Sequence, residues 1–393
     1  MATAEKSEHA PEGDAGRQVE GSRLAGFDCL RAVAALSILT YHAVLFTPAF
    51  AGTILWKVLL QLRSGVWVFF VVSGFLLYRP HVAAHRGVRP VPDLRRYALS
   101  RVLRIFPAYI AALVILTFIV QETHLRSPGR FFIQLGLLQS YDLSVIRQSF
   151  PLNITWSLAT ELSFYLFLPL YALAVVGAAR RFGVLRAEVG GLALMVVTGV
   201  VWQITTQGDV LQSLWLPNFF PVFAVGMGLA VAVQHLPAGA VPRLRSFARL
   251  GTVCWLLAFS VLAVKGLVFP GDFGFSQGHA AFPQLFFTTF AFLLVLPFVL
   301  GDGGTSLVHW LAETRVMIFL GTISYGIFLW HQPVINWIKF NWVTSHGWVA
   351  QHPLTTWLFA IAVTVPIATV SWYLVERPAM RLKDRLVSGT RTG

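Results

Sequence analysis

Long apolar stretches recur along the whole 393-residue chain and are separated by short polar segments. Several are long enough to cross a bilayer, which takes about 20 residues of α-helix. Hydrocarbon offers the backbone no hydrogen-bond partners, so such segments cross as helices. The pattern predicts an all-α fold, a polytopic membrane helical bundle of about ten transmembrane helices. We place the spans at about 29–46, 62–78, 99–120, 156–178, 189–206, 218–234, 252–268, 282–300, 316–337 and 354–375.

Residues 131–138 are apolar but too short to span, so we interpret them as an interfacial or re-entrant segment of an outer loop, 121–155. No loop is long enough to hold a separate domain. Residues 1–25 lack the apolar core of a signal peptide and are predicted to form a disordered cytoplasmic tail. Residues 26–380 form the membrane domain, and 381–393 form a basic cytoplasmic tail.

The formal net charge of +13 is explained by the predicted topology rather than by a nucleic-acid partner. Arg31 lies inside the first span, and if the N-terminus is cytoplasmic, 22 of the 30 basic residues face the inside. The outer segments hold the remaining seven, Lys57, Arg63, Arg126, Arg130, Arg147, Lys265 and Lys339. This distribution obeys the positive-inside rule, so both termini are expected to be cytoplasmic. An eleventh span at 131–138 would place Arg180 and Arg181 outside, against that rule.

Composition excludes other classes of protein. With 56% hydrophobic and only 12% charged residues, the chain is not an ordinary soluble domain. Cys29 and Cys254 lie at the starts of two predicted spans, which favours free apolar thiols over a disulfide. No Cys and His cluster has the spacing of metal ligands, so no metal site is expected.

The first predicted span contains Arg31 and His42, two side chains that are costly to bury in hydrocarbon. Eleven helical residues turn through about 1100°, about 20° more than three full turns, and rise about 16 Å. The two side chains therefore share one helix face at different depths. Asp28, one turn before Arg31, could be its salt-bridge partner.

Arg101 and Arg104 lie one helical turn apart at the inner start of the third span, level with Arg31. Guanidinium groups bind phosphate oxygens with two parallel hydrogen bonds, so the three arginines suit a phosphorylated ligand. The alternative is that Arg101 and Arg104 only anchor the helix at the inner membrane surface.

His42, Glu161 and His331 are predicted to share the outer half of the membrane. A neutral imidazole is a competent general base for a hydroxyl, and a nearby carboxylate could hold its tautomer. A purely structural role is the alternative for each, since membrane histidines also bridge helices. His331 additionally lies just before Pro333, where a kink with a structural hydrogen bond is expected nearly as readily.

Ser73 is a candidate nucleophile within the second span. It stands beside Gly74, and a serine next to a glycine in a span more often marks close helix packing.

Six ordered motifs make the chain resemble the acyltransferase 3 family of integral membrane O-acyltransferases over about 27–378. Each motif is weak alone, but six in the right order are specific. They are FDCLRAVAAL with the Arg31 and His42 pair, GVWVFFVVSGFLL at 65–77, RVLRIFPAY at 101–109, WSLATELSFYLFLPL at 156–170, SYGIFLWHQP at 324–333 and VERP at 375–378.

The resemblance implies that residues 26–380 are a transmembrane acyltransferase domain in a multi-pass protein of the bacterial cytoplasmic membrane. It implies a cytoplasmic acyl-CoA, for example acetyl-CoA, as co-substrate, with no tightly bound cofactor. The acceptor would be a hydroxyl of a carbohydrate, a cell-envelope glycan or a glycosylated natural product such as a macrolide. His42 would be the catalytic histidine, Arg31 its motif partner, and Arg101 with Arg104 the arginine pair of the third span.

The resulting hypothesis is that His42 deprotonates the acceptor hydroxyl while Glu161 orients the base or the acceptor. Arg31, Arg101 and Arg104 would bind the acyl-CoA, with Ser73 and His331 in supporting roles. A covalent acyl-histidine route stays open. A transporter or flippase for an amphipathic solute would use the same buried charges without making bonds, and a structural membrane subunit is a third reading.

Overall fold

The computed structural model describes residues 12–45, 47, 51–235, 246–247, 249–269, 281–300, 306–343 and 353–388. Within these ranges every regular element is a helix. Nine helical segments there are long and apolar enough to cross a membrane, and α14 and α15 together give a tenth if they form one bent span. The predicted helical membrane bundle of about ten spans is thereby confirmed.

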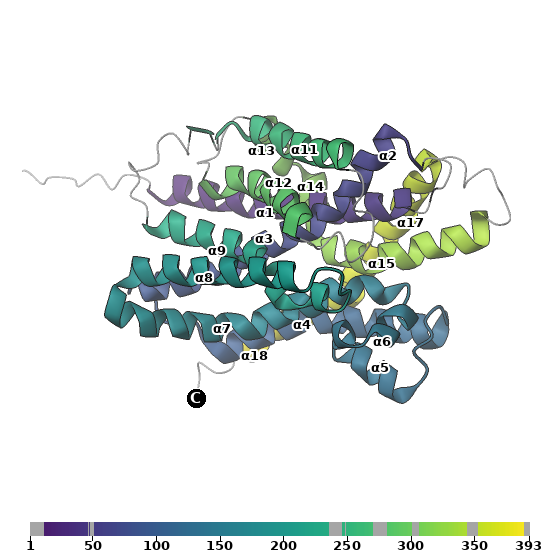
Figure 1. Ribbon diagram of the computed structural model, residues 1–393, viewed down its shortest axis with the longest axis horizontal. Coiled ribbons are helices and arrows are strands. Elements are labelled where there is room, and N and C mark those ends of the chain that lie inside the picture. Colours follow the sequence, from purple (N-terminus) through teal and green to yellow (C-terminus); the bar gives the residue numbers. More distant parts are fainter. Residues whose placement is uncertain are drawn as a thin grey trace, which may run out of the picture.

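The helices lie side by side along the long axis of the molecule (Figure 1). One end of the bundle carries α5 and α6, and we call it the loop end. The opposite end carries the turn between α7 and α8, and we call it the basic end because Arg180 and Arg181 lie there. The α-helices are α1 Glu12–Leu45, α2 Ile54–Leu59, α3 Gly65–His85, α4 Leu94–Val114, α5 Pro128–Leu135, α6 Leu143–Gln148, α7 Trp156–Phe182, α8 Val184–Thr205, α9 Phe220–His235, α11 Gly251–Val268, α12 Ala281–Leu300, α13 Leu307–Ala312, α14 Arg315–Thr322, α15 Ser324–Trp337, α17 Pro353–Ser371 and α18 Arg377–Ser388.

The predicted tails are helical where the structure describes them. Helix α1 begins at Glu12, so the helix of the first span extends through most of the segment predicted as a disordered tail. Helix α18 reaches Ser388 and has a basic, strongly amphipathic pattern. Residues 1–11 and 389–393, which complete the two predicted tails, lie outside the described residues.

The ninth span is broken, whereas the sequence analysis predicted one continuous span over 316–337. Helices α14 and α15 meet at an angle of 69° around Ile323. At Gly321 the backbone lies so close to α1 that an added Cβ atom would stand 2.2 Å from the Asp28 carbonyl oxygen. Helix α15 continues through Pro333, so the bend falls about ten residues before the position where a proline kink was considered.

Helix α3 is central to the bundle, because it packs against α1, α7, α9 and α12. Its contact with α9 is made backbone to backbone through two glycines. A Cβ atom at Gly74 would lie 2.6 Å from the Phe223 carbonyl oxygen, and one at Gly226 would lie 2.1 Å from the Val71 carbonyl oxygen. Small residues allow such close approach of membrane helices, which here fixes the rotation of α3.

The loop between α4 and α7 folds over the loop end of the bundle. Helix α5 has eight residues and is too short to cross, as predicted for 131–138. The Tyr109 hydroxyl donates a hydrogen bond to the Gln134 carbonyl oxygen, which fastens α5 to α4. Both cysteines, Cys29 and Cys254, are buried and free, which confirms the prediction for them.

Candidate active site

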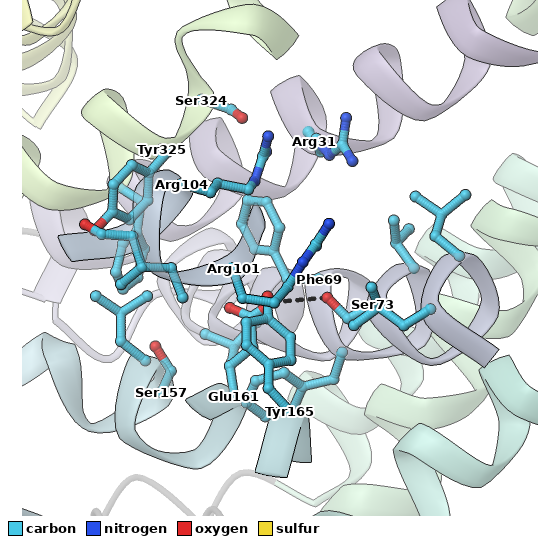
Figure 2. Close-up of a pocket in the computed structure, with 18 residues that line it drawn as sticks. Arg31, Phe69, Ser73, Arg101, Arg104, Ser157, Glu161, Tyr165, Ser324 and Tyr325 are labelled. Carbon is cyan, nitrogen blue, oxygen red and sulfur yellow. Dashed lines mark hydrogen bonds between the residues drawn. The ribbon is translucent and has the colours of Figure 1, made fainter. Parts of the chain in front are cut away.

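Two neighbouring cavities lie inside the described part of the bundle. The first, which we call the arginine cavity, has a volume of about 90 Å³ and is enclosed by α1, α3, α4, α7 and α15. Figure 2 shows the side chains that surround it. Its lining residues are Arg31, Val66, Phe69, Phe70, Val72, Ser73, Leu76, Leu77, Arg101, Arg104, Ile105, Ser157, Leu158, Glu161, Tyr165, Ser324, Tyr325 and Phe328.

The arginine cavity brings together the three arginines that the sequence placed at one depth. Their side chains extend into the same space from α1 and α4 (Figure 2). Arg31 forms an ion pair with Asp28 at 3.2 Å, as predicted. The Arg101 guanidinium carbon lies 5.6 Å from the centre of the Tyr165 ring. Arg104 makes no hydrogen bond or ion pair with a described residue, so an anionic ligand would relieve the repulsion among the three cations.

Glu161 is the carboxylate of this cavity, and it is held by two hydroxyl groups. Ser73 Oγ donates a hydrogen bond to Glu161 Oε1 at 2.8 Å, and the Tyr165 hydroxyl donates to the same oxygen. The dashed line in Figure 2 marks the contact with Ser73. The packing role considered for Ser73 thus belongs to its neighbour Gly74, which touches α9, while Ser73 faces the cavity.

The second cavity, which we call the histidine cavity, has a volume of about 250 Å³ and lies toward the loop end. Its wall combines aromatic rings with aliphatic side chains, two side-chain amides and one arginine. Its lining residues are Ile38, Tyr41, His42, Leu45, Arg63, Val66, Trp67, Phe150, Asn153, Ile154, Trp156, Phe328 and Gln332.

His42 and His331 form a hydrogen-bonded pair that fixes the tautomer of both rings. His331 Nδ1 lies 2.6 Å from the Phe328 carbonyl oxygen and 3.2 Å from that of Ile327, and carbonyl oxygens only accept. In the neutral ring, Nδ1 therefore carries the proton and Nε2 has the lone pair. That Nε2 lies 3.0 Å from His42 Nδ1, so His42 Nδ1 donates; it also lies 3.1 Å from the Ile38 carbonyl oxygen. The lone pair of His42 is left on Nε2, the position of a general base.

The predicted outer group is therefore divided, because His42 lines the histidine cavity and Glu161 lines the arginine cavity. His42 and His331 are in contact, although 289 residues separate them in the chain. Glu161 instead lines the arginine cavity, and its hydrogen bonds go to Ser73 and Tyr165. His331 Nε2 and the Ile38 carbonyl oxygen hold the His42 tautomer, whereas the sequence analysis considered Glu161 for orienting either the base or the acceptor. Among the described residues, no group of three or more His, Cys, Asp or Glu side chains is arranged to bind a metal ion.

The two cavities meet at Val66 of α3 and Phe328 of α15, since both residues line both cavities. Arg31, Arg101 and Arg104 thus line the cavity on one side of this pair. His42 lines the cavity on the other side, which also contains Arg63. An α-helix rises about 16 Å between Arg31 and His42, so the two cavities follow one another along α1.

Sequence reasoning missed two side-chain amides in the histidine cavity. The side-chain oxygens of Asn153 and Gln332 are buried and have no hydrogen-bond partner among the described residues. Buried polar atoms are nearly always paired, so each of these two oxygens lacks a donor that the described residues do not supply. Gln332 stands next to His331 in the sequence, and that proximity is the signal that would have pointed to it.

A second polar cluster, also missed, fastens α3 to α8 toward the basic end. Glu188 is fully buried; it accepts a hydrogen bond from the Tyr78 hydroxyl and lies 2.6 Å from His85 Nδ1. The cluster lines neither the arginine cavity nor the histidine cavity. The predicted fifth span began one residue after Glu188, whereas α8 begins at Val184 and includes it.

The described helices thus form a membrane bundle with three arginines around one cavity and a hydrogen-bonded histidine pair at the neighbouring one. The chain belongs to the acyltransferase 3 family: a family model described as "Acyltransferase domain" matches residues 24–376. This match covers nearly the whole chain and includes every residue of the two cavities. The protein is therefore a member of a family of membrane acyltransferases.

Several described bacterial proteins are similar to this chain along most of its length. "Nodulation protein 10" of Rhizobium leguminosarum bv. viciae is 26% identical over 92% of this chain and 95% of its own length. "O-acetyltransferase OatA" of Staphylococcus aureus strain NCTC 8325 / PS 47 is 24% identical over 90% of this chain. A protein described as a putative O-acetyltransferase in S. aureus strain COL is 22% identical. The chain spans 57% of each of these two staphylococcal proteins. No solved structure matches at a significant level.

Proposed function

We propose that the protein is an O-acyltransferase that moves an acyl group from acyl-CoA to a hydroxyl of a carbohydrate or glycosylated acceptor. The observation that carries this proposal is the His42 and His331 pair, joined at 3.0 Å. The hydrogen bond leaves the lone pair of His42 on Nε2, and His42 lines the histidine cavity. Family membership and the relatives described as O-acetyltransferases support acyl transfer as the reaction.

The donor side of the proposal rests on charge. Acyl-CoA carries phosphate groups, and three guanidinium groups in one cavity suit such an anion. The pantetheine arm of the donor has a length of the order of the rise of about 16 Å from Arg31 to His42. Phosphates bound by the arginines would therefore allow the thioester to reach toward the histidine cavity. Acetyl-CoA is the first donor to test.

The acceptor side rests on the composition of the histidine cavity. Aromatic surface in the cavity comes from Tyr41, Trp67 and Trp156. Two side-chain oxygens, on Asn153 and Gln332, lack a hydrogen-bond donor among the described residues. A polyhydroxylated ligand offers apolar ring faces and hydroxyl donors together. We therefore favour a sugar, either in a cell-envelope glycan or in a glycosylated natural product such as a macrolide.

The proposed chemistry uses His42 as a general base. His42 Nε2 takes the proton of the acceptor hydroxyl, the oxygen forms a bond to the thioester carbonyl carbon, and the carbon–sulfur bond breaks. The proton then passes to the departing sulfur, so the products are an ester and free coenzyme A. His331 keeps Nδ1 of His42 occupied as a donor throughout. A covalent acyl-histidine route would differ by releasing a burst of coenzyme A without acceptor.

The proposed orientation places the basic end in the cytoplasm of a bacterium, with a multi-pass protein in its plasma membrane. The basic end carries Arg180 and Arg181, and cytoplasmic ends of membrane proteins are enriched in such residues. The arginine cavity would then receive its donor from the cytoplasm.

The test uses membranes that contain the folded protein, radiolabelled acetyl-CoA, and glycan extracts as acceptors. We expect coenzyme A release and labelled ester with the wild type, and loss of both by about 10²–10⁴-fold in His42→Ala. His124→Ala, which changes an exposed histidine, is the matched control and should retain activity. Undiminished transfer by His42→Ala would refute the catalytic assignment. A transporter or flippase would move solute without releasing coenzyme A, which separates the rival class.

A further inference from the structure

We propose that Val66 and Phe328 form the passage through which the acyl group reaches His42, and that their size sets the length of acyl chain transferred. This inference rests on the proposed acyl transfer and adds to it a determinant of donor specificity. No motif in the sequence marked either residue for that role.

The two residues occupy the boundary of both cavities. Val66 is in the first turn of α3, and Phe328 is in the second turn of α15. Both side chains are buried, with exposed fractions of 8% and 6%, and both line the two cavities. They belong to different helices, and the wall they share therefore depends on how α3 and α15 are packed.

The chemistry requires the acyl carbon to come to this boundary. The arginines that suit the donor phosphates line the first cavity, while the base that activates the hydroxyl lines the second. The carbonyl carbon of the thioester must touch the hydroxyl oxygen for the ester bond to form. The acyl chain attached to that carbon then lies against Val66 and Phe328, which bound both cavities.

Apolar side chains at this position discriminate by volume. A well-packed hydrophobic pocket accepts or rejects one methylene group by about 10- to 200-fold in rate. A large phenylalanine ring and a branched valine leave room for a short chain, whereas smaller residues would admit longer ones. The wild type is accordingly expected to prefer acetyl-CoA to butanoyl-CoA and hexanoyl-CoA.

The backbone of Phe328 has a second role, which does not depend on its ring. Its backbone carbonyl oxygen accepts the hydrogen bond from His331 Nδ1 at 2.6 Å, while its ring lies 6.0 Å from the His331 ring. Replacement by alanine removes the ring but keeps the carbonyl group. The tautomers of His331 and His42 are therefore preserved in Phe328→Ala, and a change in chain-length preference would come from the ring.

The experiment measures transfer from acetyl-CoA, butanoyl-CoA and hexanoyl-CoA in detergent-solubilised full-length protein, with coenzyme A release and ester mass as readouts. The variants are Phe328→Ala and Val66→Ala, which enlarge the passage, and Val66→Phe, which narrows it. The matched controls are Leu329→Ala and Val68→Ala, which change buried neighbours that line neither cavity. Thermal melting of each variant verifies folding.

We expect the butanoyl-to-acetyl rate ratio to rise by about tenfold or more in Phe328→Ala and Val66→Ala. It should stay at the wild-type value in the two controls. Val66→Phe should lower transfer of all three acyl groups while coenzyme A still binds. An unchanged chain-length profile in whichever enlarging variant folds, with an active wild type, would overturn the inference. Absence of transfer from all three thioesters by the wild type would overturn the proposed function, and this inference with it.

Discussion

The Nε2 atom of His331 lies 3.0 Å from Nδ1 of His42, and this hydrogen bond joins α15 to α1 at the wall of the histidine cavity. Two backbone carbonyl groups hold the other nitrogen of His331, so the proton between the rings belongs to His42. In this pair His42 is the candidate base and His331 is the partner that orients it. His331 helps to fix the tautomer and the position of the His42 ring. This relationship leads to the first prediction.

His331→Ala should lower kcat by about 10²-fold or more without changing the KM for acetyl-CoA, because only the Ile38 carbonyl oxygen then holds His42 Nδ1 and the ring loses the partner that fixes its position. His331→Gln should recover part of the loss, because its side-chain oxygen can accept from His42 Nδ1. Steady-state kinetics with the pH profile of kcat tests both variants. Equal losses in the two would assign His331 a packing role only.

Arg104→Gln should weaken the binding of coenzyme A by about 10- to 100-fold, since one charge-assisted hydrogen bond contributes about 1.5–3 kcal/mol. Arg104 is a cleaner target than Arg31, which also neutralises Asp28. Calorimetric titration of coenzyme A into the purified protein measures the change. Arg96→Gln, an exposed position on the same helix, is the control and should bind normally. If the wild type, Arg104→Gln and Arg96→Gln bind coenzyme A with equal affinity, Arg104 only anchors its helix at the membrane surface.

Gln332→Met should raise the KM for the acceptor by about 3- to 10-fold, the value of one neutral hydrogen bond, and leave the KM for acetyl-CoA unchanged. The substitution removes the oxygen that lacks a partner and keeps the length of the side chain. Initial rates with each substrate varied in turn separate the two constants. A change confined to the KM for acetyl-CoA would contradict the placement of the acceptor in the histidine cavity.

Gly74→Ala should destabilise the protein by about 1–3 kcal/mol, because the added methyl group meets the backbone of α9 and cannot be accommodated by a rotamer change. Gly177→Ala in α7 is the matched control, since nothing lies within 4 Å of its added Cβ atom. It should be neutral or stabilising by up to about 1 kcal/mol. Melting temperatures in detergent compare the two, and equal values would show that α3 and α9 can separate at no cost.

Hydropathy determined most of the fold. The spans followed from the apolar stretches because a bilayer forces each one into a helix of about the same length. The break at Ile323 was not predicted from the sequence, because neither a proline nor a pair of glycines marks it. It depends on the contact between Gly321 and Asp28, which lie in separate helices.

Within one helix, the sequence by itself determined which site residues share a face, since the helical period is fixed: Arg31 and His42 are such a pair, and so are Arg101 and Arg104. Only the tertiary structure decided which faces meet. It paired His331 with His42, gave Glu161 to Ser73, and set Val66 opposite Phe328 between the cavities. The physical reason is that helix rotation is set by close contacts between helices, such as the one at Gly74. The period of one helix carries no information about those contacts.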